Sequence, residues 1–263
     1  MKNENIDNSR YFDWGKTSGD YARYRDIYPK EMYDKILSYG LCTKGQKVLD
    51  LGTGTGVIPR NMYKYGAEFV GADISENQIQ QAMLLSVQHN MNIEYYTSPV
   101  EELDFPENTF DVVTAFTCFF YFDHETLIKM IRKILKPNGH LLIGYLAWLP
   151  FEDKIAGESE KLILKYNPDW TGCGETRRPV DIPPVYSEFF DIVHNDYFDV
   201  KIPFTKESWN GRMKACRGVG ASLSYEQISE FEKEHLKMLN ELKSNEFYIL
   251  HNAALLDLKL KEK

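Results

Sequence analysis

The sequence has no excess of basic residues. Its 263 residues include 31 Lys and Arg against 39 Asp and Glu, so the formal net charge is −8 at pH 7. Nucleic-acid binding relies on many Lys and Arg contacts to phosphates, and binding to a membrane surface relies on a basic amphipathic helix. We therefore expect neither nucleic acid nor a membrane as a partner of this chain.

Long apolar runs and cysteine pairs are also missing. No apolar run approaches the ~20 residues that span a bilayer, and the N-terminal stretch MKNENIDNSRYFDW has no apolar signal core. The four cysteines form no CxxC pair and have no metal-ligand spacing with the six histidines. We therefore expect a cytoplasmic protein with reduced cysteines and no metal site.

The sequence does contain an alternation of apolar strands and helices. Strands are predicted at 48–51, 68–72, 93–96, 110–116 and 140–145, and helices at 29–39, 57–65, 76–88 and 124–135. After Trp148 the pattern changes to helices at 152–165, 207–215 and 225–243, with strands at 198–202 and 247–256. Five early strands separated by helices predict a parallel sheet with right-handed crossovers.

The most informative stretch is VLDLGTGTG at residues 48–56. A strand that ends in glycines lets the backbone approach a ligand without Cβ clashes, and a helix N-terminus follows it. Ligands of open parallel sheets bind at such carboxyl ends. The next strand ends at Asp73, whose carboxylate can accept both hydroxyls of a ribose. These residues predict a site for a nucleoside-containing ligand.

The glycine spacing and Asp50 favour one kind of cofactor. A dinucleotide site reads GxGxxG and holds a pyrophosphate, whereas this loop reads GxGxG with Asp50 two residues ahead of it. That carboxylate would repel a pyrophosphate and suits a cationic sulfonium with an ammonium group. An NAD-dependent dehydrogenase is therefore the weaker interpretation.

The chain resembles the class I S-adenosylmethionine-dependent methyltransferases, especially the small-molecule branch of the type 11 and type 25 families. The motifs VLDLGTGTG, VGADIS, VEELDFPENTFDVVTAF and ILKPNGHLLI carry this resemblance over roughly residues 21–144. It implies an α/β fold with a Rossmann-like sheet of seven strands, mostly parallel with the last one antiparallel. It also implies helices on both faces of the sheet, an inserted substrate-cap segment, and S-adenosylmethionine as cofactor.

The resemblance also implies a division of the chain and a set of cofactor contacts. Residues 1–148 would form the cofactor-binding core with an N-terminal lid, and residues 149–263 the substrate cap and the last strands of the same domain. We assign to the cofactor Tyr21, Arg25, Asp50, Gly52, Thr53, Gly54, Asp73, Ile74, Gln78, Pro99, Val100, Glu101 and Phe116. Within this set the two glycines would contact the amino acid part, Asp73 the ribose and Ile74 the adenine.

Four positions within the resemblance depart from the family pattern or leave alternatives open. Pro99 and Val100 replace the family's Asp-Ala pair, so the usual carboxylate for the adenine amine is lost, and Ser98 or Glu101 could replace it. Asn138 replaces a glycine in a turn, which is a mild change because Asn tolerates left-handed geometry. Arg25 would reach the cofactor carboxylate, or else lie on a solvated helix entry.

Candidates for the substrate side are Tyr121 in the first half of the chain and Trp148, Trp170, Trp209, Arg212 and Arg217 in the second half. The alternative for the candidates in the second half is ordinary packing within the cap. His124, Tyr121, Glu152 and Tyr21 are possible bases, but none carries a motif, and no catalytic residue is assigned.

The leading hypothesis is an enzyme, either a monomer or a homodimer, that methylates a small molecule. The alternatives are a tRNA or protein methyltransferase and a cofactor-binding module without catalysis.

Overall fold

The computed structural model of this chain describes residues 6–262. Its contacts divide into two compact units, and each unit is assembled from three separate segments of the chain. Unit 1 comprises Met1–Ile27, Ala147–Arg177 and Asp199–Asn252, and unit 2 comprises Tyr28–Leu146, Arg178–Phe198 and Ala253–Lys263. The predicted division after residue 148, into a cofactor-binding core and a cap segment of the same domain, stays a prediction.

Unit 2 holds the glycine loop and most of the sheet. Its helices are α2 (Lys30–Ser38), α3 (Val57–Met62), α4 (Glu76–Gln88), α5 (His124–Ile134) and α7 (Tyr186–Phe189). Its own strands are β1 (Lys47–Leu51), β2 (Glu68–Asp73), β3 (Glu94–Thr97) and β4 (Phe110–Phe116). Three long strands contribute residues to both units, namely β5 (Leu135–Trp148), β6 (Phe190–Thr205) and β7 (Glu246–Leu260).

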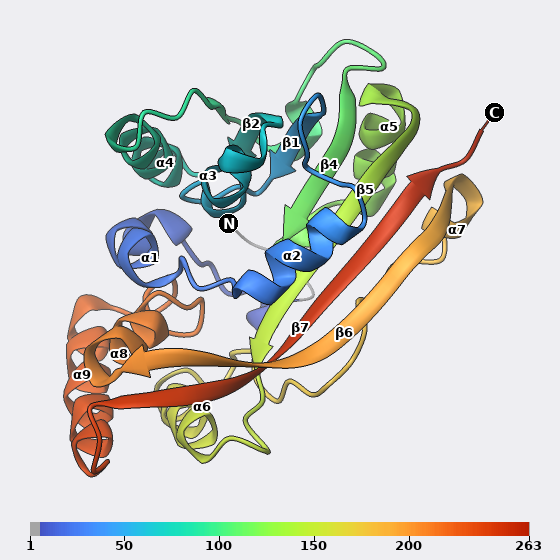
Figure 1. The fold of residues 1–263 in the computed structure, drawn as a ribbon. Coiled ribbons are helices and arrows are strands. Elements are labelled where there is room, and N and C mark those ends of the chain that lie inside the picture. Colours follow the sequence, from blue (N-terminus) through green and yellow to red (C-terminus); the bar gives the residue numbers. More distant parts are fainter. Residues whose placement is uncertain (1–5, 263) are drawn as a thin grey trace. The chain divides into compact units, whose positions relative to one another are not determined.

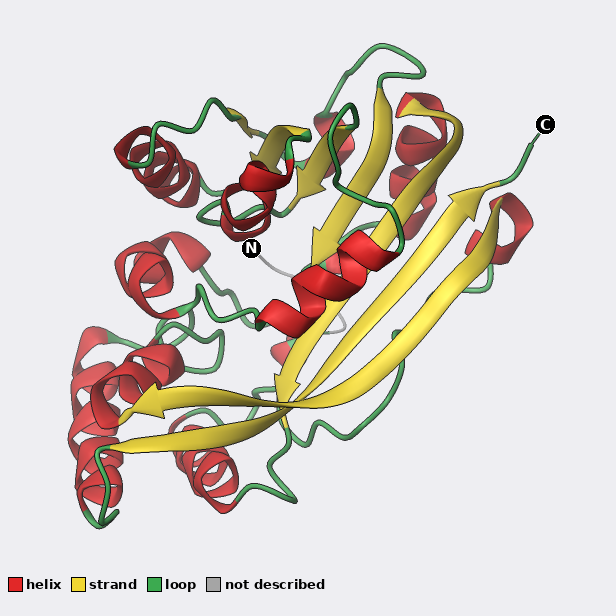
Figure 2. Cartoon of the chain, viewed as in Figure 1, coloured by secondary structure: helices red, strands yellow, loops and turns green. Residues whose placement is uncertain are grey.

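The sheet has seven strands in the order β3-β2-β1-β4-β5-β7-β6. The pairs from β3 through β5 are all parallel, and the arrow of β7 points against those of β5 and β6 (Figure 1). Helices and strands alternate along most of the chain (Figure 2). This confirms the predicted α/β fold with a mostly parallel sheet of seven strands.

The central strands read as apolar runs because both of their faces are covered. On one face, Leu49 and Val113 belong to a buried cluster with Leu127 and Ile131 of α5. Figure 1 draws α2 in front of β4 and β5. Burial on both faces leaves the carboxyl ends of β1 and β2 as the place where polar groups gather.

Strand β5 corrects one expectation from the sequence. Residues 136–139, Lys-Pro-Asn-Gly, were expected to form a turn between the helix predicted at 124–135 and the strand predicted at 140–145. In the structure β5 already begins at Leu135. The backbone accommodates the change through Asn138, whose φ is 63°. The register with β4 shifts between Phe110 and Val112. The segment is therefore an irregular part of the strand, in which Asn tolerates the left-handed conformation.

Unit 1 is mainly helical. Its helices are α1 (Ser18–Tyr24), α6 (Lys154–Tyr166), α8 (Lys206–Lys214) and α9 (Tyr225–Asn240). Helices α8 and α9 begin with capping boxes built on Thr205 and Ser224, which satisfy the free N–H groups of the first turn. Within residues 6–262, no helix is both long enough and apolar enough to cross a membrane.

A buried hydrogen-bond network around His235 joins three helices of unit 1. The Nε2 atom of His235 lies 2.9 Å from Ser159 Oγ, and its Nδ1 lies 2.9 Å from Asn210 Oδ1. Trp209 Nε1 donates to the same Ser159 Oγ. The order Ser–His–Asn resembles a nucleophile with its base, but Ser159 and His235 have no exposed surface. The network is therefore structural.

This network predicts acid sensitivity. Burial lowers the pKa of His235 to about 4, below the ~6.5 of an unfolded histidine. Between these values only the unfolded chain takes up the proton, so the free energy of unfolding falls as pH drops, by roughly 3 kcal/mol in total. In urea unfolding across this pH window, wild type should lose roughly 3 kcal/mol more stability than His235→Gln, because the other buried titratable groups are the same in both proteins. His89→Gln, at an exposed position, should leave the slope unchanged; equal slopes in all three proteins would contradict this account.

Candidate active site

Strand β1 ends in a loop whose backbone favours glycine. Gly52, Gly54 and Gly56 have φ values of 60°, 55° and 74°, a conformation that costs other residues roughly 1 kcal/mol or more each. The N–H of Thr53 donates to the carbonyl oxygen of Ala72 at 2.9 Å. The glycines thus hold a tight turn against the carboxyl end of β2, as the sequence pattern indicated.

Asp73 ties this loop to the next helix. Its Oδ2 accepts the N–H of Gly54 at 2.9 Å, and its Oδ1 accepts the N–H of Ser75 at 2.8 Å. Burial raises the pKa of Asp73, while these two backbone hydrogen bonds oppose the rise. Each carboxylate oxygen can accept a further hydrogen bond. The side chain is therefore directed at the glycine loop and retains acceptor capacity for two hydroxyls.

Asp50 is a buried carboxyl whose hydrogen-bond partner is a hydroxyl group. It is 2% exposed, and its Oδ1 accepts the hydroxyl of Thr114 at 2.6 Å. Burial raises the pKa of Asp50 to about 7, and the charge of Asp73 adds to the rise. A buried acid of this kind is stabilised in its ionised form by a nearby positive charge. The site can therefore favour a cationic ligand.

The sequence analysis missed two residues beside the loop. Thr114 lies in register with Asp50 on the neighbouring strand, a relation that strand pairing alone could have revealed. Cys118 donates its thiol to the carbonyl oxygen of Leu51, with the sulfur 3.1 Å away. Thr114 lies within the motif VEELDFPENTFDVVTAF, which does not single it out, and Cys118 lies just after that motif.

Cys118 makes Gly52 sensitive to substitution. A Cβ at Gly52 would lie 2.7 Å from Cys118 Sγ, and its φ is left-handed. We expect Gly52→Ala to lower the free energy of unfolding by roughly 2–3 kcal/mol through clash and backbone strain. In a Cys118→Gly background, which removes both the Sγ and the Cys118 Cβ that would lie 2.8 Å away, the clash is relieved, so the same change should cost only about 1 kcal/mol. Equal costs in both backgrounds, measured by denaturant unfolding, would contradict the proposed contact.

The remaining loop and helix residues differ in their exposure. Ile74, directly after Asp73, is 50% exposed, which leaves an apolar surface next to the carboxylate. Thr53 and Gln78 are buried, and Ser75 caps α4 by accepting the N–H of Gln78. The structure therefore gathers Ile74 and the Asp73 carboxylate at one strand end, with Thr53 and Gln78 supporting them.

The segment after β3 contains Pro99 and Val100, which replace the Asp-Ala pair whose carboxylate binds the adenine amine in the family. Val100 is buried, whereas Glu101 is exposed and its Oε1 accepts the N–H of Asp123. The hydroxyl of Ser98 donates to Pro99 O at 2.9 Å. Because a hydroxyl that donates one hydrogen bond can still accept another, Ser98 retains the capacity to replace the missing acceptor.

Phe116 at the end of β4 is held by its neighbours. Its ring fills the space beside Gly144, where a Cβ would lie 2.1 Å from the ring. Tyr28 packs edge-on against it with centroids 5.5 Å apart, and the Tyr28 hydroxyl bonds Thr117 Oγ1 at 2.9 Å. Its predicted contact with the methionine part of a cofactor stays a prediction.

Tyr21 and Arg25 belong to unit 1. The Arg25 guanidinium carbon lies 4.7 Å from the centroid of the Tyr21 ring, a cation–π arrangement that holds the two side chains together. Their predicted position near the cofactor carboxylate stays a prediction.

The cap candidates in unit 1 form two buried groups. Trp148 packs against Trp209 and Trp170, its Nε1 donates to Glu160, and Arg212 covers its ring at 4.9 Å. In the other group, Arg217 pairs with the buried Asp7, with Nε 3.4 Å from Oδ2, and also donates to Thr171. These five candidates thus have packing or charge partners within the unit, and the sixth candidate, Tyr121, belongs to unit 2. Their proposed role in substrate binding stays a prediction.

The four possible bases also have partners in the structure. His124 Nδ1 lies 3.1 Å from the Tyr186 hydroxyl, and burial lowers the pKa of this histidine. Glu152 accepts a hydrogen bond from Arg177 at 2.7 Å, and Tyr121 packs on Phe120. With Tyr21 against Arg25, none of the four is marked out as a base by its contacts.

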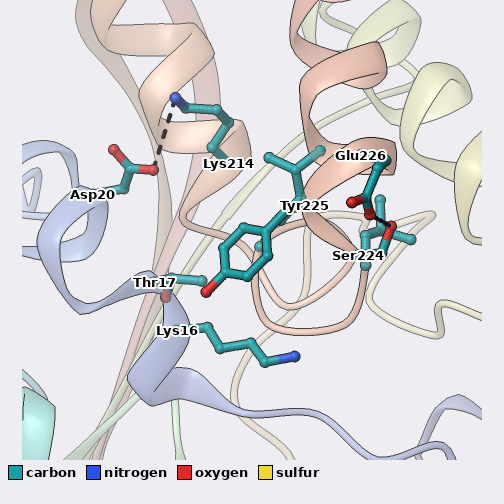
Figure 3. Close-up of a pocket in the computed structure, with 10 residues that line it drawn as sticks. Lys16, Thr17, Asp20, Lys214, Ser224, Tyr225 and Glu226 are labelled. Carbon is teal, nitrogen blue, oxygen red and sulfur yellow. Dashed lines mark hydrogen bonds and ion pairs between the residues drawn. The ribbon is translucent and has the colours of Figure 1, made fainter.

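A cavity of about 380 Å³ in unit 1 was not predicted. Figure 3 shows Tyr225 at its centre, with Lys214 paired to Asp20 at 3.8 Å and Ser224 bonded to Glu226 at 2.9 Å. Lys214 also pairs with Glu232 at 2.9 Å. Because these charges are matched within the protein, the cavity presents no clear preference for a ligand of one sign.

Comparison with known proteins gives one family. Residues 49–143 match the family model described as a methyltransferase domain. A ubiquinone biosynthesis O-methyltransferase of Bradyrhizobium diazoefficiens is 32% identical over 133 residues, which are 49% of this chain and 51% of that protein. A protein of the same name from Coxiella burnetii is 30% identical over 133 residues, 50% of this chain and 56% of that protein. The chain thus spans about half the length of the curated relatives it matches.

Solved structures share the fold at low sequence identity. The YcgJ protein of Bacillus subtilis has a TM-score of 0.55 and 16% identity, covering 89% of this chain and 100% of that one. Phosphoethanolamine N-methyltransferase 2 of Haemonchus contortus, solved with phosphomonomethylethanolamine and S-adenosylhomocysteine, has a TM-score of 0.53 and 19% identity. That alignment covers 94% of this chain and 58% of that one.

The matched family model, the motifs around the glycine loop and the strand order all agree. Residues 49–143 therefore form a class I S-adenosylmethionine-dependent methyltransferase domain.

Proposed function

We propose that this chain is an S-adenosylmethionine-dependent methyltransferase that transfers a methyl group to a small-molecule acceptor. The observation that carries the proposal is Asp73, a carboxylate fixed between the Gly54 and Ser75 N–H groups at the carboxyl end of β2. It presents acceptor oxygens beside a loop of left-handed glycines, which together fit an adenosyl group.

The residues of unit 2 fit the cofactor along its length. Asp73 would accept the ribose hydroxyls, and the exposed Ile74 would cover one face of the adenine. Gly52 and Gly54 would approach the amino acid part, and the buried Asp50 would face its positive charge. Thr53, Gln78, Pro99, Val100, Glu101 and Phe116 would complete the walls. The assignment of Tyr21 and Arg25 to the cofactor stays a prediction.

The reaction asks little acid–base chemistry of the protein. When bound, the cofactor supplies an electrophilic methyl group on a sulfonium. The protein holds the acceptor atom in line with it and excludes water, which supplies much of the rate. No side chain is assigned as a base, because none of the four candidates is positioned as one.

The acceptor is proposed to be a small molecule. The net charge of −8 disfavours nucleic acid. The side chains proposed for acceptor binding are those predicted from the sequence, namely Tyr121, Trp148, Trp170, Trp209, Arg212 and Arg217. The two curated relatives named above are called ubiquinone biosynthesis O-methyltransferases, which supports a hydroxyl acceptor. The predicted cytoplasmic location stays a prediction.

An acceptor screen tests this function. Purified chain is incubated with S-adenosylmethionine and separate hydroxyl, thiol, amine and carboxylate acceptors, and release of S-adenosylhomocysteine is measured. We expect turnover with at least one hydroxyl compound and none by Asp73→Ala. Cofactor binding without turnover on any acceptor would favour the module without catalysis, and turnover only on tRNA or protein would contradict the small-molecule proposal.

A further inference from the structure

Strand β6 leaves one edge of the sheet open in unit 2. It is the last strand in the sheet order, and its residues Ile192, Val193 and Tyr197 are 59%, 44% and 51% exposed. An edge strand carries a row of backbone N–H and C=O groups that lack a ladder partner, and these can pair with a strand of another chain. The edge therefore offers both hydrogen-bonding groups and apolar surface.

The usual protections of an edge strand are missing from this part of β6. Residues 192–198 contain neither proline nor lysine, two residues that commonly block edge pairing. Its single carboxylate, Asp196, is matched within the chain, because Lys35 Nζ lies 3.2 Å away and the Tyr39 hydroxyl donates to it. A second strand can therefore pair with this segment without bringing an unpaired carboxylate into the interface.

The two faces of the segment are distinct. His194 stacks on Tyr39, the residue that caps the C-terminus of α2, with centroids 3.9 Å apart. Its Nδ1 lies 3.1 Å from the buried Asp257 on β7. Because side chains alternate along a strand, Val193 and Tyr197 lie on the face opposite to α2. They form an apolar pair that flanks the exposed Asn195.

The sequence of this segment is complementary to itself. In an antiparallel pairing about a two-fold axis at Asn195, Val193 faces Tyr197 of the other copy, and His194 faces Asp196. β-branched–aromatic pairs are favourable across antiparallel strands, and an imidazole N–H can donate a hydrogen bond to a carboxylate. An isologous contact of this kind closes on itself. At the margin of the pairing, Asp191 is matched by Lys261 at 3.6 Å.

We propose that two copies of this chain form a homodimer by antiparallel pairing of β6 over residues 192–198, with Asn195 at the two-fold axis. We assign a second copy of this chain to the edge because antiparallel pairing of β6 with its own copy places Val193 opposite Tyr197 and His194 opposite Asp196. The proposal is independent of methyl transfer.

Sedimentation velocity of the full chain over a wide concentration range tests the proposal. The wild-type chain should shift from monomer to dimer as concentration rises. Val193→Lys and Tyr197→Lys, which place charge in the paired face, should abolish the shift. Val87→Lys, at another exposed apolar position on α4, should leave it intact.

Site-specific disulfide formation tests the register. Asn195→Cys should yield a covalent dimer under mild oxidation, because a residue on the axis meets its own copy within the distance that a disulfide spans. Asp191→Cys should not, because the two copies of that position would lie roughly 26 Å apart along the strands. The wild-type chain controls for the native cysteines.

Three outcomes would overturn the proposal. The wild-type chain could remain monomeric at every concentration. A dimer could survive both lysine substitutions and fail to cross-link at Asn195→Cys, which would place the interface elsewhere. Finally, a monomeric chain that captures only a foreign β-strand peptide would show that the edge serves a different partner.

Discussion

Replacing Asp73 by alanine should weaken the binding of S-adenosylhomocysteine by about 100-fold or more. Two hydrogen bonds from ribose hydroxyls to an ionised carboxylate contribute roughly 1.5–3 kcal/mol each, and every 1.4 kcal/mol is a factor of ten. The substitution also frees the N–H groups of Gly54 and Ser75, which Asp73 holds at 2.9 and 2.8 Å. Isothermal titration calorimetry measures the change directly.

Two variants separate ligand contact from loop support. Asp73→Asn keeps one carbonyl oxygen as an acceptor, so its loss should be intermediate, roughly tenfold. Glu68→Ala, at the other end of β2, removes an exposed carboxylate that pairs with Lys47, and it should leave affinity unchanged. An Asp73→Ala protein that is folded by circular dichroism and binds as tightly as wild type would refute the assignment.

The affinity for S-adenosylhomocysteine should rise with pH up to neutrality. Burial raises the pKa of Asp50 to about 7 in the free protein, and a ligand ammonium group binds the ionised form better. Below that pH the Asp50 carboxyl must lose its proton before the ligand ammonium group can bind, so the affinity for S-adenosylhomocysteine should fall by up to tenfold per pH unit. Above it the profile should level off. Calorimetry across this range measures the profile.

Asp50→Asn should remove the pH dependence of ligand affinity, and it should also make the free protein more stable. The wild-type carboxyl titrates near 7 when folded but near 3.9 when unfolded. The stability it contributes below its unfolded pKa is lost as pH rises toward 7, by at most roughly 4 kcal/mol. The asparagine stays neutral, so the free variant should be more stable than wild type at about pH 8 yet bind more weakly. A variant that binds with the wild-type pH profile would contradict the role of Asp50.

The two titrations have opposite effects on stability. His235, with its pKa lowered to about 4, destabilises the fold as pH falls, whereas Asp50 destabilises it as pH rises. In the wild-type chain their slopes partly cancel over the same pH window. Single variants are therefore needed to resolve either contribution.

The sequence predicted the elements around the glycine loop closely. The helix at 76–88 and the strand at 110–116 have the same bounds in the structure, because strong apolar patterns and clear start signals coincide there. Ser75 is a helix cap as well as the partner of Asp73. Local and long-range interactions therefore specify the same boundary.

Prediction from sequence was poorer for the outer strands. The strand predicted at 198–202 is part of β6, which begins at Phe190. Residues 190–197 mix apolar and charged side chains because both faces of an edge strand are partly exposed, so the usual alternation is obscured. The buried Asp257 was also missed, because its partners His140 and His194 come from distant strands.

Only part of the candidate site was predictable, because contacts between residues that are distant in the sequence leave no local pattern. Asp73 and the glycines follow from a contiguous motif, whereas Thr114 reaches Asp50 only through strand pairing. The partner of Arg217, Asp7, lies near the other end of the sequence, and no local pattern links the two residues. Local motifs thus located the glycine loop and Asp73, whereas the contacts of Asp50 and Arg217 depend on tertiary structure.

Calorimetric titration of the folded wild-type chain with S-adenosylhomocysteine, beside a parallel titration with NAD, tests the central claim most directly. The account predicts saturable binding of one S-adenosylhomocysteine per chain and no heat from NAD. Folded protein that binds neither compound, or that binds NAD instead, would contradict it.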